Sequence, residues 1–196
     1  MPKRIFEACP DVRLIYLLRD PVARAVSQYT HAWNMGRLRK TPAELAGQHQ
    51  FQSIMDASHY ARQLRAYLDY FHPDQILVLD FETLLSAPQG HLDAILRHIG
   101  AEPMGVPTLS AHNGNDELER VPKSMLRLTH GRLRPLLTRL VGPKMRGQLR
   151  RLMARGPRRG APGFPDALLQ SMRDDLAEDT RRLRHMTGQE FSKWSI

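Results

Sequence analysis

LIYLLRDPVARAVSQY, residues 14–29, is the stretch of sequence that decides the fold. The apolar run at 12–18 contains β-branched and aromatic side chains, which is typical of a strand covered on both faces in a parallel sheet. Asp20 then predicts a helix N-cap, and Pro21 predicts the first helical residue. We expect that helix to run to about Met35, before a glycine. The stretch therefore predicts a strand that turns tightly into a helix.

Helices and strands alternate through the first hundred residues. Apolar residues at helical spacing predict helices over 3–9, 53–71 and 88–99, and a second buried strand is expected at 75–81. The segment 37–52 is expected to be a loop with at most one short helix. This alternation is typical of an α/β fold, with a parallel sheet flanked by helices. Five aromatic residues are interpreted as core rather than as stacking platforms: Tyr60, Tyr67, Tyr70, Phe71 and Trp194.

Beyond residue 100 the pattern changes. The chain is first irregular and polar, and then forms short helices that glycine and proline interrupt. A final helix begins near Pro165 and ends at Gly188, with apolar side chains along one side. We expect a single domain over residues 1–196, in which 1–100 form the α/β part and 101–196 a mainly helical C-terminal part.

The net charge and the single cysteine indicate which partners and sites suit this sequence. Lys and Arg number 29 against 20 Asp and Glu, so a basic protein of this kind favours anionic partners such as nucleic acid, lipid headgroups or phosphorylated small molecules. Cys9 is the only cysteine, which excludes an intrachain disulfide and a Cys-based zinc site. We therefore expect a cytoplasmic protein without a metal, and no apolar run reaches the ~20 residues that span a bilayer.

Arg19 and Ser27 are the candidate anion-binding residues. Arg19 lies at the carboxyl end of the predicted strand, where ligands bind in open α/β sheets, and its guanidinium can hold two phosphate oxygens. The N-terminus of the following helix also favours a phosphate. Ser27 lies two turns into that helix, roughly 9 Å from Pro21, so both groups could converge on one phosphate. The alternative is an ordinary polar stripe, in which Arg24 and His31 face water.

This stretch closely resembles the 3′-phosphate-binding motif of sulfotransferases that use 3′-phosphoadenosine-5′-phosphosulfate (PAPS). The shared pattern is a strand, then Arg-Asp-Pro, then a helix with Ser eight residues after the Arg. Arg24 matches the RDPxxRxxS version in carbohydrate-type and bacterial members. The segment HYARQLRAYLDYFHPDQILVLDFETLLSAP and the closing GQEFSKW also look like the family. The resemblance implies a P-loop-NTPase-like fold, 3′-phosphate binding by Arg19, Ser27 and Arg24, and sulfuryl transfer from PAPS to a hydroxyl or amine.

One part of the family pattern is not matched. The family begins with a strand and a Gly-x-x-Lys-x-Gly-Thr-Thr loop that cradles the 5′-phosphosulfate, and GPKMRGQ, residues 142–148, lacks the strand and the Ser/Thr. We expect the N-terminal portion to be absent, which would expose an edge or a face of the sheet. Because that loop stabilises the charge on the leaving oxygen, we expect weak or no sulfuryl transfer from residues 1–196 alone.

The sequence gives weaker support to the remaining candidate residues. Lys123 is a weak candidate for a phosphate contact, in an irregular segment with His112 and Asn113. His31 and His59 are the histidines considered as catalytic bases. His31 is interpreted as a surface residue, the role of His59 beside the apolar side of its helix stays open, and the catalytic base is unassigned. Asp80 and Glu82 are interpreted as capping and hydrogen-bonding groups. Two other classes stay open: a basic nucleic-acid- or nucleotide-binding module without catalysis, and a P-loop kinase relative, which would need the same loop.

Overall fold

The computed structural model describes residues 1–84, 86–105 and 160–196. Its contacts group the chain into two compact units. The first comprises Met1–Ala25, His49–Leu109 and Asp166–Ile196, and the second comprises Val26–Gln48 and Ser110–Pro165. The expectation of a single domain stays a prediction.

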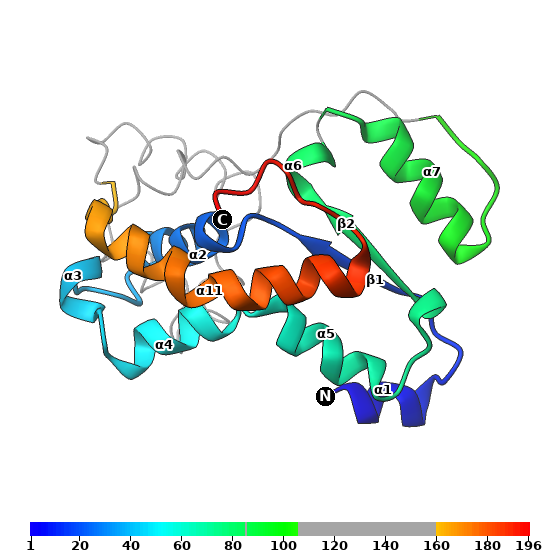
Figure 1. The fold of residues 1–196 in the computed structure, drawn as a ribbon, viewed down its shortest axis with the longest axis horizontal. Helices are drawn as coiled ribbons and strands as arrows, with labels where there is room; N and C mark the ends of the chain where they lie inside the picture. The colour runs from blue at the N-terminus through cyan, green and yellow to red at the C-terminus, as the bar shows by residue number, and fades with distance from the viewer. Residues whose placement is uncertain (85, 106–159) are drawn as a thin grey trace, which may run out of the picture. The chain divides into compact units, whose positions relative to one another are not determined.

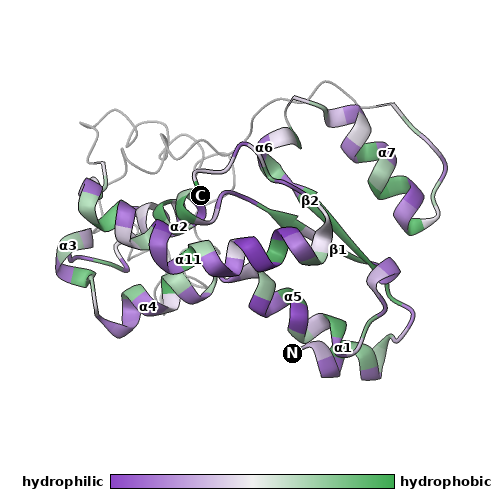
Figure 2. Cartoon of the chain, viewed as in Figure 1, coloured by the Kyte–Doolittle hydropathy of each residue, from purple (hydrophilic) through white to green (hydrophobic). Residues whose placement is uncertain are grey.

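The first unit is built on two parallel strands, β1 (Leu14–Leu18) and β2 (Ile76–Asp80). Leu14 pairs with Ile76 and Leu18 with Asp80, so the carboxyl ends of the two strands lie together. Both strands are coloured as hydrophobic along most of their length in Figure 2. The two strands predicted from the sequence are confirmed, and so is the α/β fold with a parallel sheet.

Helices α5 (Tyr60–Leu68) and α11 (Asp166–Thr187) cover one face of these strands. Figure 1 shows the two helices side by side, next to the strands. The buried core between these elements includes Leu18, Tyr60, Ala61, Leu64, Leu183, Phe191 and Trp194. This apolar burial is what holds the C-terminal helix against segments more than a hundred residues earlier in the chain.

The opposite face of β1 is open. Ile15 and Leu17 are 44% and 48% exposed, whereas Leu18 is 1% exposed. Within this chain, the expectation that the strand is covered on both faces is therefore wrong. A continuous apolar run does not distinguish one covered face from two, because the pattern records composition and not the elements that pack on it.

The helix predicted over 53–71 is two helices, α4 (His49–Asp56) and α5. The break at 57–59 has a tertiary cause. The hydroxyl of Ser58, which is 1% exposed, donates to the carbonyl of Pro21 at 2.7 Å. The carboxylate of Asp179 in α11 then accepts the N–H groups of Ala61 and Arg62, at 2.8 and 3.0 Å. A carboxylate from another segment thus caps the new helix start, which local periodicity cannot predict.

The other helices of the first unit are α1 (Pro2–Ala8), the first part of α2 (Pro21–Asn34), the 3₁₀ turn η1 (Pro73–Gln75), α6 (Phe81–Leu84) and α7 (Pro88–Ile99). Among these, α1, α2 and α7 were predicted, whereas η1 and α6 were not. Gly100 and Gly188 end α7 and α11 with φ of +71° and +66°, a region that favours glycine. Among the described helices, none is long and apolar enough to cross a membrane.

The second unit contains the rest of α2 and the helix α3 (Pro42–Leu45). Thr41 and Glu44 form a capping box at the start of α3. Segment 37–52 therefore holds α3 and the start of α4, one helix more than expected. Tyr29 is fully buried in this unit, edge-on to Phe164 at 5.1 Å, and its hydroxyl donates to the carbonyl of Lys40 at 3.1 Å.

The aromatic core prediction is confirmed for three of its five residues. Tyr60, Phe71 and Trp194 are buried, and Tyr67 is half-buried. Tyr70 is 39% exposed, so its assignment to the core is wrong. It lies just after the end of α5, and its ring centre is 6.1 Å from that of Phe6.

Candidate functional site

Arg19 lies immediately after β1, at the carboxyl end of the two strands. Its Nε donates to Oε1 of Glu82 at 3.2 Å, and its guanidinium carbon lies 5.6 Å from the centre of the Phe81 ring. The Arg19 side chain is 41% exposed. Within the described residues, the two terminal nitrogens of this guanidinium have no hydrogen-bond partner. Arg19 thus keeps two donors that an anion can use.

The backbone N–H groups at the start of α2 are largely used by Asp20. Its Oδ1 accepts the N–H of Ala23 at 2.7 Å, and its carbonyl accepts the N–H of Arg24 at 2.8 Å. Pro21 has no N–H to offer. The predicted N-cap is therefore confirmed, but the cap leaves less of the helix N-terminus for a phosphate than the sequence suggests. Anion binding at this turn then depends chiefly on the side chain of Arg19.

The main chain of Arg19 is held from the core side by Tyr60. The hydroxyl of Tyr60 forms a hydrogen bond with the backbone of Arg19. Burial raises the pKa of Tyr60 to about 12, against the lowering effects of Arg24 and of this hydrogen bond. Tyr60 is therefore neutral at physiological pH, and it fixes the position of Arg19 without adding a negative charge.

Asp80 and Glu82 follow β2 and have different tasks. The buried Asp80 accepts the backbone N–H of Glu82 at 3.0 Å and the indole N–H of Trp194 at 3.1 Å, both on Oδ1. Its predicted hydrogen-bonding role is confirmed. Glu82 instead pairs with Arg19, which is 63 residues earlier in the chain. No sequence signal indicated this pair, because it depends on the parallel register of the two strands.

Arg24 makes contacts within the protein. Its Nε donates to the Ser58 hydroxyl at 2.6 Å, and its Nη2 donates to the carbonyl of Ile54. Burial lowers the pKa of Arg24. The side chain therefore joins the start of α2 to the α4–α5 junction rather than facing water, as the polar-stripe alternative had it. A phosphate contact by Arg24 stays a prediction.

The other sequence-predicted residues are less constrained by the structure. Ser27 is half-buried in α2 and belongs to the second unit, so its convergence with Arg19 stays a prediction. His31 is exposed near the end of the same helix. Lys123 lies outside the described residues, as do His112 and Asn113.

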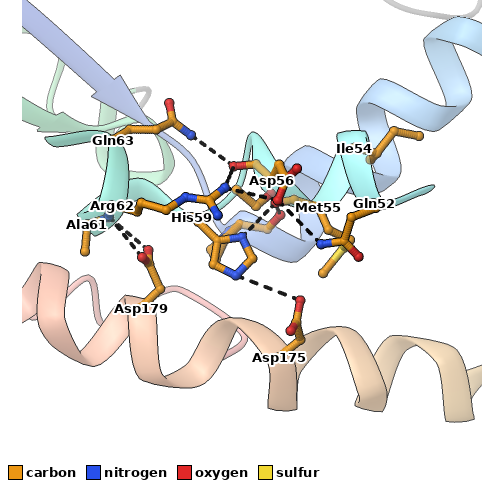
Figure 3. A network of polar contacts seen from close by, with 12 residues as sticks. Gln52, Ile54, Met55, Asp56, His59, Ala61, Arg62, Gln63, Asp175 and Asp179 are labelled. Atoms are coloured by element: carbon orange, nitrogen blue, oxygen red, sulfur yellow. Dashed lines mark hydrogen bonds and ion pairs between the residues drawn. The ribbon is translucent and has the colours of Figure 1, made fainter. Parts of the chain in front are cut away.

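A second polar cluster lies between α5 and α11, bordering a cleft of about 470 Å³ (Figure 3). His59 Nδ1 lies 3.2 Å from the carbonyl oxygen of Met55, and its Nε2 lies 3.9 Å from the carboxylate of Asp175. Arg62 Nη2 contacts the Asp56 carboxylate at 3.0 Å. His59 thus joins the end of α4 to α11. No group of three metal-ligating side chains occurs in the parts of the chain that the structure describes.

Comparisons with known proteins agree with the motif around Arg19. The sulfotransferase domain model matches residues 1–125. Human heparan sulfate glucosamine 3-O-sulfotransferase 6 is 27% identical over 201 residues, covering 97% of this chain and 52% of that protein. Human heparan sulfate glucosamine 3-O-sulfotransferase 3B1 is 27% identical over 164 residues, covering 74% of this chain and 41% of that protein. The chain spans about half the length of the curated relatives it matches.

A solved structure shares the fold. The sulfotransferase from Alicyclobacillus acidocaldarius superposes with a TM-score of 0.62 at 20% identity, covering 100% of this chain and 62% of that one. The shared fold agrees with the sequence match. The family model covers well over half of the residues. By its sequence, this chain belongs to the sulfotransferase domain family.

Proposed function

We propose that this chain anchors the 3′-phosphate of PAPS in a sulfotransferase reaction, with Arg19 as the principal contact. The observation that carries the proposal is the state of the Arg19 guanidinium. Its Nε is held by Glu82, while its terminal nitrogens are unpartnered within the described residues. Two parallel donors on a fixed plane suit phosphate oxygens. Ser27 is proposed as the second contact on the same phosphate, with Arg24 and Lys123 as further candidates.

The residues present fit a nucleotide with a terminal phosphate. Asp20 and Asp80 are buried, and both carboxylates accept hydrogen bonds within the protein. Glu82 is the remaining carboxylate of this turn, and it is paired with Arg19. When bound, PAPS supplies the sulfuryl group, and the chain contributes the anchor that orients the donor. Orientation of this kind accounts for a large share of catalysis in group transfer.

The acceptor is proposed to be a hydroxyl or amine of a glycan. Two kinds of relative support this assignment by name: the heparan sulfate glucosamine 3-O-sulfotransferases, and mouse bifunctional heparan sulfate N-deacetylase/N-sulfotransferase 4, which is 28% identical over 120 residues. The net charge of +9 suits an acidic glycan, because opposite charge favours encounter. A cytoplasmic location stays a prediction.

The proposal is tested by thermal unfolding of the purified chain with three ligands. Adenosine 3′,5′-bisphosphate at a hundred times its Kd should stabilise the protein by about 2.7 kcal/mol, which corresponds to a rise in Tm of roughly 5–10 °C. AMP, which lacks the 3′-phosphate, should give a much smaller rise. Arg19→Ala should remove the difference between the two nucleotides while leaving the Tm without ligand nearly unchanged, since Arg19 is substantially exposed.

Two results would overturn the assignment. One is an equal shift with AMP and with the bisphosphate in the wild-type protein. The other is a larger shift with a DNA oligomer than with either nucleotide, which would support the nucleic-acid-binding alternative instead.

A further inference from the structure

The position of the Arg19 guanidinium depends on the start of α6. Glu82, the second residue of that helix, accepts from Arg19 Nε, and the ring of Phe81, its first residue, lies beneath the guanidinium. Whatever fixes residues 81 and 82 therefore also fixes the direction in which the two terminal nitrogens of Arg19 are presented.

Helix α6 cannot supply this rigidity alone. It has four residues, and a single helical turn is unstable in isolation because its nucleation costs more than its hydrogen bonds return. Its start is held instead by Asp80, whose Oδ1 accepts the N–H of Glu82 at 3.0 Å. The carbonyl of Asp80 also accepts the hydroxyl of Thr83 at 2.9 Å. The rigidity of this turn therefore depends on Asp80, a residue that is only 8% exposed.

The C-terminal segment, residues 188–196, holds Asp80 and the turn after it. The indole N–H of Trp194 donates to Asp80 Oδ1 at 3.1 Å, in a bond that is buried. Lys193 Nζ donates to the carbonyl of Glu82 at 3.3 Å, and the N–H of Ser195 donates to the Asp20 carboxylate. Figure 1 shows this segment, in red, running along β2 and past α6. One short segment therefore contacts the residues that flank Arg19 from both strands.

The C-terminal segment is itself held in place. Trp194 is stacked on Phe191 at 4.2 Å between ring centres, and it lies 5.9 Å from the ring of Tyr60. The guanidinium of Arg184 donates to the carbonyls of Glu190 and Ile196, at 2.8 and 2.7 Å. These contacts tie both ends of the segment to α11. It can therefore act as a fixed support and does not need a ligand to order it.

We propose that Trp194 is a positioning residue for Arg19. Its indole N–H orients Asp80, Asp80 orients the start of α6, and Glu82 at that start holds the Arg19 guanidinium with its terminal nitrogens available. This inference rests on the proposed function, because the positioning of Arg19 serves to present it to a 3′-phosphate. Trp194 acts through these residues and does not itself contact the nucleotide.

The experiment follows the Arg19 side chain directly. The Nε–Hε signal of Arg19 in ¹⁵N-labelled protein is assigned by its loss in Arg19→Lys. Trp194→Phe keeps an aromatic ring but removes the N–H, so we expect this signal to shift or broaden. The Kd for adenosine 3′,5′-bisphosphate should rise by about threefold or more, as is usual for coupled residues of one hydrogen-bond network.

Gln189→Ala is the matched control. Gln189 lies in the same segment, but its amide donates to the carbonyl of Val78 in the middle of β2, at 3.0 Å, rather than at the strand end. The control should lose a comparable bond to the sheet while leaving the Arg19 signal and the Kd unchanged. Glu82→Ala should reproduce the spectral change of Trp194→Phe, because it removes the acceptor for Arg19 Nε.

The outcomes separate this inference from the proposed function. An unchanged Arg19 signal in Trp194→Phe, or an equal change in Gln189→Ala, would overturn the positioning role. A shifted signal in a protein whose wild type does not bind the bisphosphate would support the positioning of Arg19 and overturn the proposed function. If Trp194→Phe does not fold, Asp80→Asn decides by the same signal, because it weakens the shared acceptor for the indole N–H and for the N–H of Glu82 while keeping the side-chain shape.

Discussion

Two polar clusters in the first unit differ in the charges that surround their arginines. At the carboxyl end of the strands, Arg19 is held by one nitrogen, and its other nitrogens have no partner within the described residues. In the α5–α11 cleft, Asp179 caps two backbone N–H groups, and Arg182 Nε donates to Glu178 at 2.8 Å. Both clusters join distant segments, but the second lines its cleft with the carboxylates of Asp175, Glu178 and Asp179 beside its arginines.

The proposed function assigns ligand binding to the first cluster and a stabilising role to the second. A charged group whose hydrogen bonds are met within the protein stabilises the arrangement that meets them. A guanidinium that is fixed at one nitrogen and open at the others is preorganised for an external anion. The size of the cleft alone would have pointed to the α5–α11 cluster, whereas the carboxylates that line this cleft disfavour an anion there and leave Arg19 as the candidate.

The largest expected effect is on ligand binding at Arg19. Arg19→Lys keeps the charge but loses the planar pair of donors, so we expect affinity for adenosine 3′,5′-bisphosphate to fall about tenfold or more. Isothermal titration measures this loss. Arg182→Lys makes the same change in the α5–α11 cleft, and its affinity should equal that of the wild type. An equal loss in both variants would erase the distinction between the two clusters.

The next effect is on stability in the α5–α11 cluster. Asp179→Ala removes the acceptor for the N–H groups of Ala61 and Arg62, and we expect the free energy of unfolding to fall by about 1–2 kcal/mol. Urea unfolding gives this value, and Asp179→Asn should recover part of it because one oxygen acceptor remains. The affinity for adenosine 3′,5′-bisphosphate should not change. A loss of binding free energy larger than the loss of unfolding free energy would contradict a structural role for Asp179.

Alkaline pH tests the support beneath Arg19. Because burial raises the pKa of Tyr60 from 10 to about 12, the folded state keeps a proton that the unfolded state loses in this range. Stability should therefore be unaffected by this group below pH 10 and should fall as the pH rises from 10 to 12. Tyr60→Phe should fall less steeply over that range. Tyr70→Phe is the control, because Tyr70 is exposed, and a slope change in that variant would contradict the prediction.

The smallest effect is expected from an exposed ion pair in the cleft. Arg182 and Glu178 are spaced i, i+4 on α11, with side chains that are 69% and 47% exposed. Arg182→Ala should change the free energy of unfolding by only about 0.3–0.5 kcal/mol. A loss above about 1 kcal/mol in urea unfolding would mean that this pair acts together with Asp179 in stabilising the packing of α5 and α11.

Local sequence was sufficient where neighbours along the chain decide the structure. The strand at 14–18, the Asp20 cap and the glycine that ends α7 were all predicted, because each depends on contacts within a few residues. The same holds for α11, whose apolar side is buried at Met172, Leu176 and Leu183. The resemblance to sulfotransferases was likewise carried by a short motif, and the family match confirms it.

The sequence by itself determined the strand–turn–helix around Arg19 and the chemistry that this arginine can offer, because both are properties of contiguous residues. Only the tertiary structure decided that Glu82 holds the guanidinium, that Asp179 starts α5 where periodicity continues a helix, and that Trp194 reaches Asp80. These contacts join residues 63 to 118 positions apart. Such pairs exist only after apolar burial has brought the segments together, so no local pattern encodes them.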